Sequence, residues 1–323
     1  MNETEGMMKM FFLKREIEKI VKDRTFPRLL FACFTHTGIT NILSDKTHVC
    51  LAFRVITGKK LNLSNPHTFR EKLQWLKLYD RNPLYSIMVD KYEVKKYVED
   101  KGYSHYVIPT IGVWESVSEI DFSNLPKSFV LKCTHDSGSV VICRDKKDFK
   151  GNVAQKKLRK GIKRNFYYNG REWPYKNVKP RIIAEPYLAE LGGNVIEYKI
   201  FCFGGEPYII LVCTGDAHTN KRKHSWFDTK FKKLPFKIGA SYLQGDKIQK
   251  PDNLQEMLEF AKEMSQGIPQ VRVDLYNVEG QIYFGEFTFF HESGYKAFFP
   301  EDWDEKIGEL IKLPKTGKNT KFN

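Results

Sequence analysis

Four polar side chains, Arg272, Asp274, Glu286 and Thr288, interrupt a stretch of alternating apolar residues. The alternation and the turn at Asn277–Gly280 predict two strands joined as a β-hairpin, because glycine supplies the positive φ that a tight turn needs. Residues two apart on a strand point to the same face, so the four groups can converge. Two carboxylates on adjacent strands repel unless a cation lies between them, and such oxygen ligands suit Mg²⁺ shared with nucleotide phosphates. The alternative is a hairpin face that these residues only keep hydrated.

The length and composition indicate a protein with two or three subdomains. The chain has 323 residues, of which 41% are hydrophobic and 14% aromatic, enough for substantial cores. No apolar run approaches the ~18 residues that a membrane span needs. The apolar stretch at residues 9–13 is short for a secretory signal and lacks a small-residue cleavage site. We therefore expect a cytoplasmic protein.

Six cysteines occur without any C-x-x-C spacing, and four of them lie in apolar runs with strand character. This pattern is typical of reduced thiols inside a protein, so we expect them to be buried and free. The six are Cys33, Cys50, Cys133, Cys143, Cys202 and Cys213.

Positive charge is concentrated in one part of the chain. The formal net charge is +14, and thirteen Lys and Arg residues face only two acids between Lys146 and Arg181. An acidic partner is implied, and the candidates are nucleic acid, anionic lipid headgroups and a polyanionic glycan. The alternative is a basic surface that only aids solubility. Six of these cations crowd a stretch expected to be helical: Lys156, Lys157, Arg159, Lys160, Lys163 and Arg164.

Helices are expected in the N-terminal part. Periodic apolar residues between 8 and 60 predict helices that show no chemistry. A capping box at Thr68–Glu71 predicts the start of another helix, and a further helix from about Lys91 is expected to end at Gly102. Much later in the chain, Pro251 opens a helix whose apolar stripe is typical of a core element.

A predicted strand at residues 129–133 carries Lys132 among apolar neighbours. The small polar loop that follows, at 134–138, contains a glycine, so its backbone N–H groups could turn inward as an anion nest. Lys132 and this nest would together hold phosphate. The alternative is an edge lysine beside an ordinary turn, because one glycine is a weak signature.

Three further segments are expected to be strands. Residues 181–188 predict a short strand that could present backbone groups to a base. Residues 197–203 and 208–213 predict a hairpin on which Glu197 and Lys199 share a face.

Taken in order, several segments resemble the ATP-grasp superfamily, and specifically its teichuronopeptide-biosynthesis (TupA-like) branch of bacterial capsule and cell-wall polysaccharide clusters. The resemblance covers roughly residues 50–313. The segments are Leu61–Pro66, Glu71–Leu76, Val89–Glu93, Leu131–Gly138, Arg171–Tyr175, Pro180–Glu185 and Gly285–Phe289. The resemblance implies an α+β ATP-grasp fold, in which two α+β lobes clamp ATP after an N-terminal, mostly helical region.

This resemblance divides the chain into four expected regions. Residues 1–124 form the helical region that precedes the clamp, and residues 125–188 form the smaller lobe with the phosphate loop and the basic segment. Residues 189–313 form the C-terminal lobe with the metal site. Residues 314–323 are expected to be a mobile basic tail.

The resemblance also implies a nucleotide site. Lys91 and Lys132 match two lysines that contact phosphate, and Glu197 matches the acid that binds ribose. Lys199 matches a further phosphate contact and is a candidate catalytic residue. The loop that closes over the triphosphate matches His135, Asp136, Ser137, Gly138 and Ser139, and the adenine hinge matches Glu185, Tyr187 and Leu188.

The resemblance further implies magnesium, with two ions expected, held by Asp274 and Glu286. The superfamily usually has Asn two residues after that glutamate, whereas this chain has Thr288, which leaves the coordination of the second ion open. Arg272 matches the arginine that faces the acyl phosphate in ligases. His291 could assist as a base, although a lone histidine beside two phenylalanines is more often a packing residue.

The expected function is therefore that of an ATP-dependent carboxylate–amine ligase that works through an acyl phosphate. It would join an amino acid or another amine to an acidic sugar, such as a uronate of a bacterial surface or capsular polysaccharide. Peripheral contact with the anionic inner face of the membrane is left open. One alternative is a glycosyltransferase of polysaccharide biosynthesis. Another is a nucleic-acid-binding protein, which is disfavoured because no recognised RNA- or DNA-binding module is present.

Overall fold

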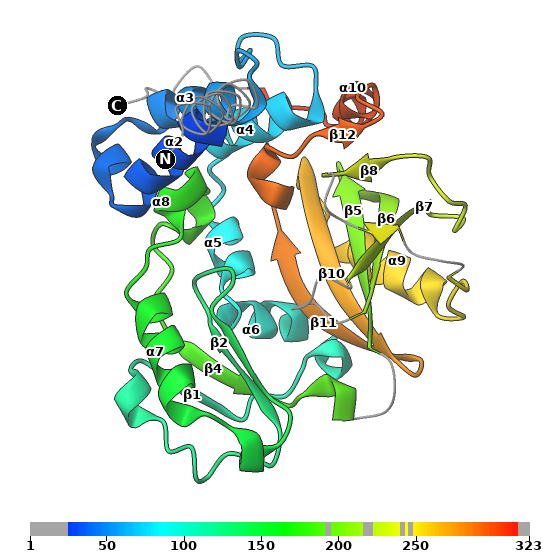
Figure 1. Ribbon diagram of the computed structural model, residues 1–323. Coiled ribbons are helices and arrows are strands. Elements are labelled where there is room, and N and C mark those ends of the chain that lie inside the picture. The colour runs from blue at the N-terminus through cyan, green and yellow to red at the C-terminus, as the bar shows by residue number, and fades with distance from the viewer. Residues whose placement is uncertain (1–24, 191–194, 216–221, 240–242, 245–247, 316–323) are drawn as a thin grey trace, which may run out of the picture.

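The N-terminal part of the protein is helical, as expected. The computed structural model describes residues 25–190, 195–215, 222–239, 243–244 and 248–315. The apolar periodicity before residue 25 and the basic tail after residue 315 lie outside these residues. The helices are α2 (Thr25–His36), α3 (Asp45–Thr57), α4 (Phe69–Tyr79), α5 (Leu84–Val89) and α6 (Glu93–Asp100). Figure 1 shows α2, α3 and α4 grouped at one end of the molecule.

Helix α4 begins with the capping box that its sequence predicts. The Thr68 side chain accepts from the Glu71 N–H, and the Glu71 carboxylate accepts from the Thr68 N–H. One residue into the helix, Arg70 Nε donates to Asp304 Oδ2 at 2.6 Å. Asp304 lies on α10 (Trp303–Leu310), and both partners are buried. The N-terminal helices are thereby fastened to a helix near the other end of the chain.

A four-stranded sheet forms the smaller layer, with strand order β1-β4-β2-β3. Its core is built from alternate buried residues of β2, whose other face carries Lys132. Helix α7 covers β2 and β3 and contains four of the six cations that the sequence predicts to be helical, whereas Lys163 and Arg164 follow its last residue. The elements are β1 (Gly112–Trp114), β2 (Phe129–Cys133), β3 (Val140–Cys143), β4 (Ile182–Glu185), α7 (Gly151–Ile162) and α8 (Tyr167–Gly170).

A six-stranded sheet forms the larger layer, with order β11-β10-β5-β6-β7-β9. Helix α9 packs its apolar stripe against one face, as its sequence predicts (Figure 1). Helix α6 contacts both sheets, since Lys95 pairs with Glu185 of β4 and Tyr97 packs on Phe287 of β11. The elements are β5 (Ile196–Phe203), β6 (Glu206–Thr214), β7 (Lys223–Asp228), β9 (Leu243–Gln244), α9 (Leu254–Met264), β10 (Gln270–Val278) and β11 (Gln281–Thr288).

Short elements complete the described chain. Two of them pair as a small sheet, β8 (Lys237–Ile238) with β12 (Phe298–Phe299). The 3₁₀ helices are η1 (Ile39–Ile42), η2 (Ser104–Tyr106), η3 (Val117–Glu119), η4 (Lys146–Asp148), η5 (Trp173–Tyr175), η6 (Leu188–Glu190) and η7 (His291–Gly294). Among the described residues, no helix has both the length and the apolar character to cross a bilayer.

The cysteines are all free, but they are not all buried. Four are enclosed by the cores, namely Cys133, Cys143, Cys202 and Cys213. Cys50 is half-buried, and Cys33 is exposed. The expectation of burial is therefore wrong for Cys33, because it lies on α2, where most residues face outward.

Candidate functional site

A cavity of about 720 Å³ lies between the two sheets, within the size range of small-molecule sites. The four-stranded sheet contributes Lys132 and Glu185 to its wall, and the six-stranded sheet contributes Glu197 and Glu286. Lys91, which precedes α6, adds a further cation to the lining. The cavity therefore brings together residues that lie far apart in the sequence.

Glu185 is held between two lysines at the base of this cavity. Its carboxylate accepts from Lys132 Nζ and from Lys95 Nζ, each at 2.6 Å. Burial opposes the charge on Glu185, but the two ammonium groups lower its pKa below the ordinary value. Lys132 is half-buried; burial opposes its charge, but the Glu185 carboxylate beside it raises its pKa above the ordinary value. Both groups are thus charged at neutral pH, and Tyr187 and Leu188 follow them along the wall.

The loop predicted to close over phosphates is divided between interior and cavity. Asp136 is buried, and its side chain accepts from Arg164 Nη2 at 2.8 Å and from Ser139 Oγ at 2.5 Å. His135 is also buried, with Nε2 lying 3.1 Å from the carbonyl oxygen of Arg164. Only Ser137 and Gly138 of the five predicted residues line the cavity. The other three side chains support the loop from inside.

A run of paired charges leads from the cavity to the hairpin. Lys199 Nζ donates to Glu197 Oε1 at 2.7 Å and to Asp274 Oδ2 at 2.5 Å. Arg272 holds Asp274 with two bonds of 2.6 Å, from Nε to Oδ1 and from Nη2 to Oδ2. Burial disfavours the Asp274 carboxylate, but Arg272 and Lys199 lower its pKa below the ordinary value. The run therefore keeps an ionised, fully buried carboxylate on the hairpin.

The two predicted metal ligands face each other across the hairpin. Asp274 pairs with Glu286 and Arg272 with Thr288, and the pairing shifts by one residue at Gly285. Gly285 is thus a β-bulge, and without it a regular hairpin would place Glu286 on the face opposite Asp274. In the observed register, Lys91 Nζ lies 3.8 Å from Glu286, and Thr288 Oγ1 accepts from Arg272 Nη2 at 2.9 Å.

This donor set fits magnesium only in part. No group of three or more His, Cys, Asp or Glu side chains with metal-site geometry occurs among the described residues. Two carboxylates and one hydroxyl nevertheless suit an ion that completes its coordination with phosphate oxygens and water, as Mg²⁺ commonly does. Because Arg272 and Lys199 now occupy the Asp274 oxygens, an ion would have to compete with them.

His291 is fixed as a hydrogen-bond donor. Arg272 Nη1 lies 2.5 Å from His291 Nδ1, and because an arginine can only donate, Nδ1 is the acceptor. Burial, followed by the charges of Arg272 and Lys199, holds the pKa of His291 well below its ordinary value, so the ring is neutral. Its one proton therefore lies on Nε2. This arrangement does not suit the base predicted from the sequence, because Nδ1 is occupied and Nε2 already carries the proton.

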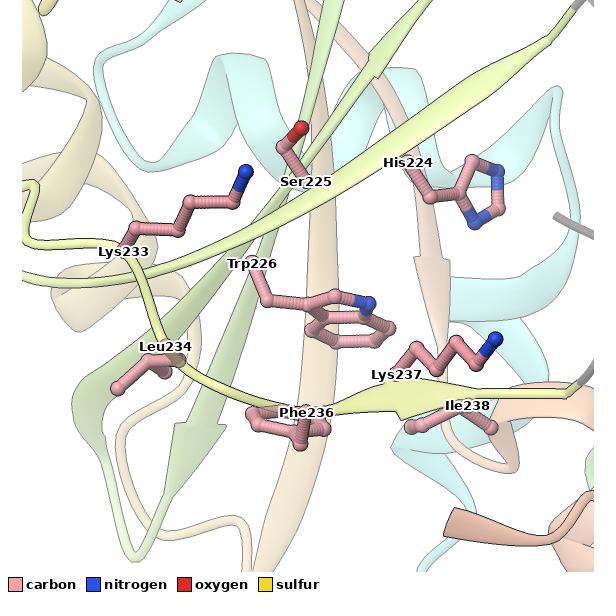
Figure 2. Close-up of a pocket in the computed structure, with 8 residues that line it drawn as sticks. All are labelled: His224, Ser225, Trp226, Lys233, Leu234, Phe236, Lys237 and Ile238. Carbon is pink, nitrogen blue, oxygen red and sulfur yellow. The ribbon is translucent and has the colours of Figure 1, made fainter. Parts of the chain in front are cut away.

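Aromatic side chains hold the His291 ring. Phe201 and Trp226 meet it edge to face, with ring centroids 5.2 and 6.2 Å away. A small pocket of about 10 Å³ lies beside Trp226 and has room for about one water molecule. Figure 2 shows His224, the indole nitrogen of Trp226 and Lys237 extending to the same side of this pocket. Its size identifies it as part of the packing around His291 rather than as a substrate site.

Three cations at the site were not predicted. Lys95 pairs with Glu185, Arg222 pairs with Glu197, and Arg144 lines the cavity and donates to Tyr187 Oη at 3.2 Å. Lys95 follows Lys91 at a spacing of four, which could have suggested it. Arg222 is one of three consecutive cations, and no local pattern distinguishes it from its neighbours.

A cavity between two mainly antiparallel sheets, lined by lysines and by carboxylates from both sheets, is the arrangement expected of an ATP-grasp fold. The family model described as TupA-like ATP-grasp matches residues 71–312, and the chain belongs to this family. The predicted family and fold class are thereby confirmed. No curated protein matches the sequence.

Solved structures of several ligases are similar in part. D-Alanine–D-alanine ligase from Bacillus anthracis, complexed with ATP, is 19% identical, with 63% of this chain and 55% of that chain covered and a TM-score of 0.37. The corresponding Helicobacter pylori enzyme is 17% identical, with 76% and 68% covered and a TM-score of 0.41. The ATP-grasp ligase PsnB, complexed with a minimal precursor, Mg and ADP, is 11% identical, with 68% and 57% covered and a TM-score of 0.36. The chain thus spans little more than half the length of the first of these proteins.

Proposed function

We propose that the protein is an ATP-dependent ligase that joins a carboxylate to an amine. The observation that carries this proposal is the run of paired charges from Glu197 through Lys199 and Asp274 to Arg272, which connects a nucleotide-sized cavity with the hairpin. In such a run, Lys199 and Arg272 would stabilise negative charge on a phosphate and on an oxyanion that develops next to it.

The cavity residues divide into two groups by chemistry. The backbone at residues 186–188 would bind the adenine of ATP, and Glu197 would bind its ribose. Lys91, Lys132 and the Ser137–Gly138 backbone would receive the phosphates. Asp274 and Glu286 would hold magnesium beside Thr288, and the bound ion would offset charge on the phosphates. Two magnesium ions are expected from the family resemblance.

The reaction proceeds in two steps. A carboxylate oxygen of the acid attacks the γ-phosphorus of ATP, the bond to the β–γ bridging oxygen breaks, and ADP leaves. The amine then attacks the carbonyl carbon of the acyl phosphate, its C–O bond to phosphate breaks, and the nitrogen loses a proton to give an amide. Arg272 would stabilise the oxyanion of the second step, and His291 would supply a second donor through Nε2.

We propose an acidic sugar, such as a uronate of a bacterial surface polysaccharide, as the acid, and an amino acid or a related amine as its partner. The basic helix α7 beside the phosphate loop supports an anionic acceptor. A cytoplasmic location, with contact to anionic lipid, would suit such an acceptor.

A glycosyltransferase is less well supported. The spacing Asp-x-Asp, which marks many sugar-nucleotide sites, occurs at Asp302–Asp304. Asp304 is buried against Arg70, however, and Asp302 pairs with Lys306 within α10. These aspartates therefore stabilise helix contacts.

The test is the fate of ATP. Incubation with ATP, Mg²⁺, a panel of uronates and hydroxylamine should release ADP and phosphate and trap the acyl phosphate as a hydroxamate. Release of AMP with pyrophosphate, or of UDP from a sugar nucleotide without ATP consumption, would exclude this ligase chemistry.

A further inference from the structure

The turn that follows β11 has an unusual backbone. Glu292, Ser293 and Gly294 have φ values of 50°, 52° and 69°, so three consecutive residues are left-handed. This conformation is disfavoured for residues with a Cβ, and it persists where surrounding contacts impose it. The turn begins at His291, whose ring meets Arg272.

Helix α4 supplies contacts that impose the turn. Lys77 Nζ donates to the carbonyl oxygen of Ser293 at 2.8 Å and lies 2.9 Å from its Oγ. Gln74 Nε2 donates to the carbonyl oxygens of Ser293 and Gly294, both at 3.1 Å. On the other side, a Cβ at Gly170 would lie 2.4 Å from Ser293 Oγ. Ser293 is thus enclosed between α4 and α8.

Lys77 is a charged group in an interior position. It is fully buried and interacts electrostatically with the buried carboxyl group of Glu172, which also forms a side-chain hydrogen bond with Ser293 of the turn. Burial lowers the pKa of Lys77 to about 8, although Glu172 acts in the opposite direction. Two buried opposite charges are often no more stabilising than apolar residues of the same size, so stability alone gives little reason for Lys77 and Glu172.

We propose that Lys77, Gln74 and Glu172 are positioning residues for the ligase reaction. They impose the left-handed turn, and the turn holds His291 so that Nδ1 meets Arg272 and Nε2–H is offered to an oxygen of the acid substrate. The expected effect on ligase kinetics rests on the proposed function, whereas the expected effect on the orientation of His291 rests on the geometry of the turn alone.

The test separates a structural role from a positioning role. The double variant Lys77→Met with Glu172→Gln removes both buried charges without leaving either unpaired, so its melting temperature should stay near that of the parent. The matched control, Arg70→Met with Asp304→Asn, removes another buried pair of the same helix. Both should be studied with ADP and Mg²⁺ present.

The first readout is the ¹⁵N NMR spectrum of the histidine rings, which reports the tautomer of His291 without any reaction. It should change in the Lys77 double variant and stay unchanged in the control.

The second readout is the hydroxamate assay, with hydroxylamine and the best uronate. The kcat/KM for the uronate should fall about tenfold or more while the KM for ATP stays nearly constant, because a small misplacement of reacting groups lowers the rate by this much.

A substitution that changes no charge provides a second test in case the double variant does not fold. Gln74→Met removes two donors to the turn and leaves no charge unpaired, so the same two changes are expected. The proposal is overturned if a folded variant of either kind keeps both the His291 spectrum and the uronate kcat/KM of the parent. If the parent itself makes no hydroxamate, the proposed function fails, and the NMR arm still decides the positioning role.

Discussion

Asp274 lies opposite Glu286 because one residue, Gly285, bulges out of the strand between them. A Cβ at Gly285 would come within 3.0 Å of the Asp274 carbonyl oxygen and of Tyr276 Cε2. Gly285→Ala should therefore displace the hairpin and lower the free energy of unfolding by about 1–3 kcal/mol. Urea denaturation measures this loss. Gly151→Ala is the control, because its new Cβ would meet no atom closer than 3.8 Å. An equal loss of unfolding free energy in the two variants would contradict the close approach of the backbone at Gly285.

Removing either hairpin carboxylate should lower turnover strongly, and Asp274→Asn should also destabilise the folded protein, because it leaves the buried charges of Arg272 and Lys199 without their counter-charge. Asp274→Asn or Glu286→Gln removes charge that would hold the ion beside the phosphates, so kcat/KM should fall by about two orders of magnitude or more. ADP release measures the loss, and circular dichroism checks the fold. Activity near that of the parent in both variants would refute the metal site.

Neutralising Glu185 should destabilise the protein. Glu185→Gln leaves Lys95 and Lys132 facing each other without a counter-charge, and breaking a buried pair in this way costs about 3–5 kcal/mol. Saturating ATP should offset part of this loss if the phosphates lie near Lys132. Thermal and urea denaturation, with and without ATP, measure both effects. Glu115→Gln, which breaks the exposed pair with Lys179, should leave stability nearly unchanged.

His48 should make the protein acid-sensitive. It is buried, and burial, with the charges of Arg171 and Lys77, lowers its pKa to about 4 from the ordinary 6.5. Between these values the unfolded chain binds a proton that the folded chain does not, so stability falls as the pH drops from 6.5 toward 4. After allowance for screening, the contribution is roughly 1–2 kcal/mol. His48→Gln should flatten the pH profile of unfolding, whereas His67→Gln, at an exposed position, should not.

The exposed cations of α7 should recruit a polymeric acidic acceptor. Lys156, Lys160 and Lys163, the last of which directly follows α7, form a set of three exposed charges; the exposed Lys157 and Arg159 donate to the Val140 carbonyl oxygen and to Gln155, and Arg164 holds Asp136. Reversing the three exposed charges should therefore raise the KM for a polymeric uronate several-fold and flatten its salt dependence, with the KM for ATP unchanged. A short uronate is the internal control. Unchanged kinetics with loss of binding to anionic liposomes would instead make the helix a membrane contact.

The hairpin shows how far the sequence can lead. Alternation and the turn at Glu279–Gly280 predict both strands and the pairs Arg272 with Asp274 and Glu286 with Thr288. Alternation alone would place the two pairs on opposite faces, because it does not reveal that Gly285 is unpaired. The convergence of the carboxylates therefore depends on a packing detail.

The phosphate loop shows the opposite limit. Its place after Lys132 is predictable, but Asp136 and Ser139 turn inward because Arg164, from beyond α7, provides a partner for the buried carboxylate. Likewise, Lys132 in an apolar strand signals a buried charge, yet its partner Glu185 lies 53 residues away. Local patterns identify groups that need partners, while the topology selects the partners.

The bond between Arg70 and Asp304 joins α4 to a helix that is synthesised after every candidate site residue. Lys72 adds to this junction, since its Nζ donates to the carbonyl oxygens of Gly308 and Ile311, both at 2.8 Å. Because α4 also holds the left-handed turn, a nascent chain that has emerged only through Gly294 would carry the cavity, the carboxylates and His291, but α4 would still lack its contacts with α10. The site would then become complete in one late step of synthesis, when α10 docks on α4. One of the first helices of the described chain would thus be held in place by a helix near its end.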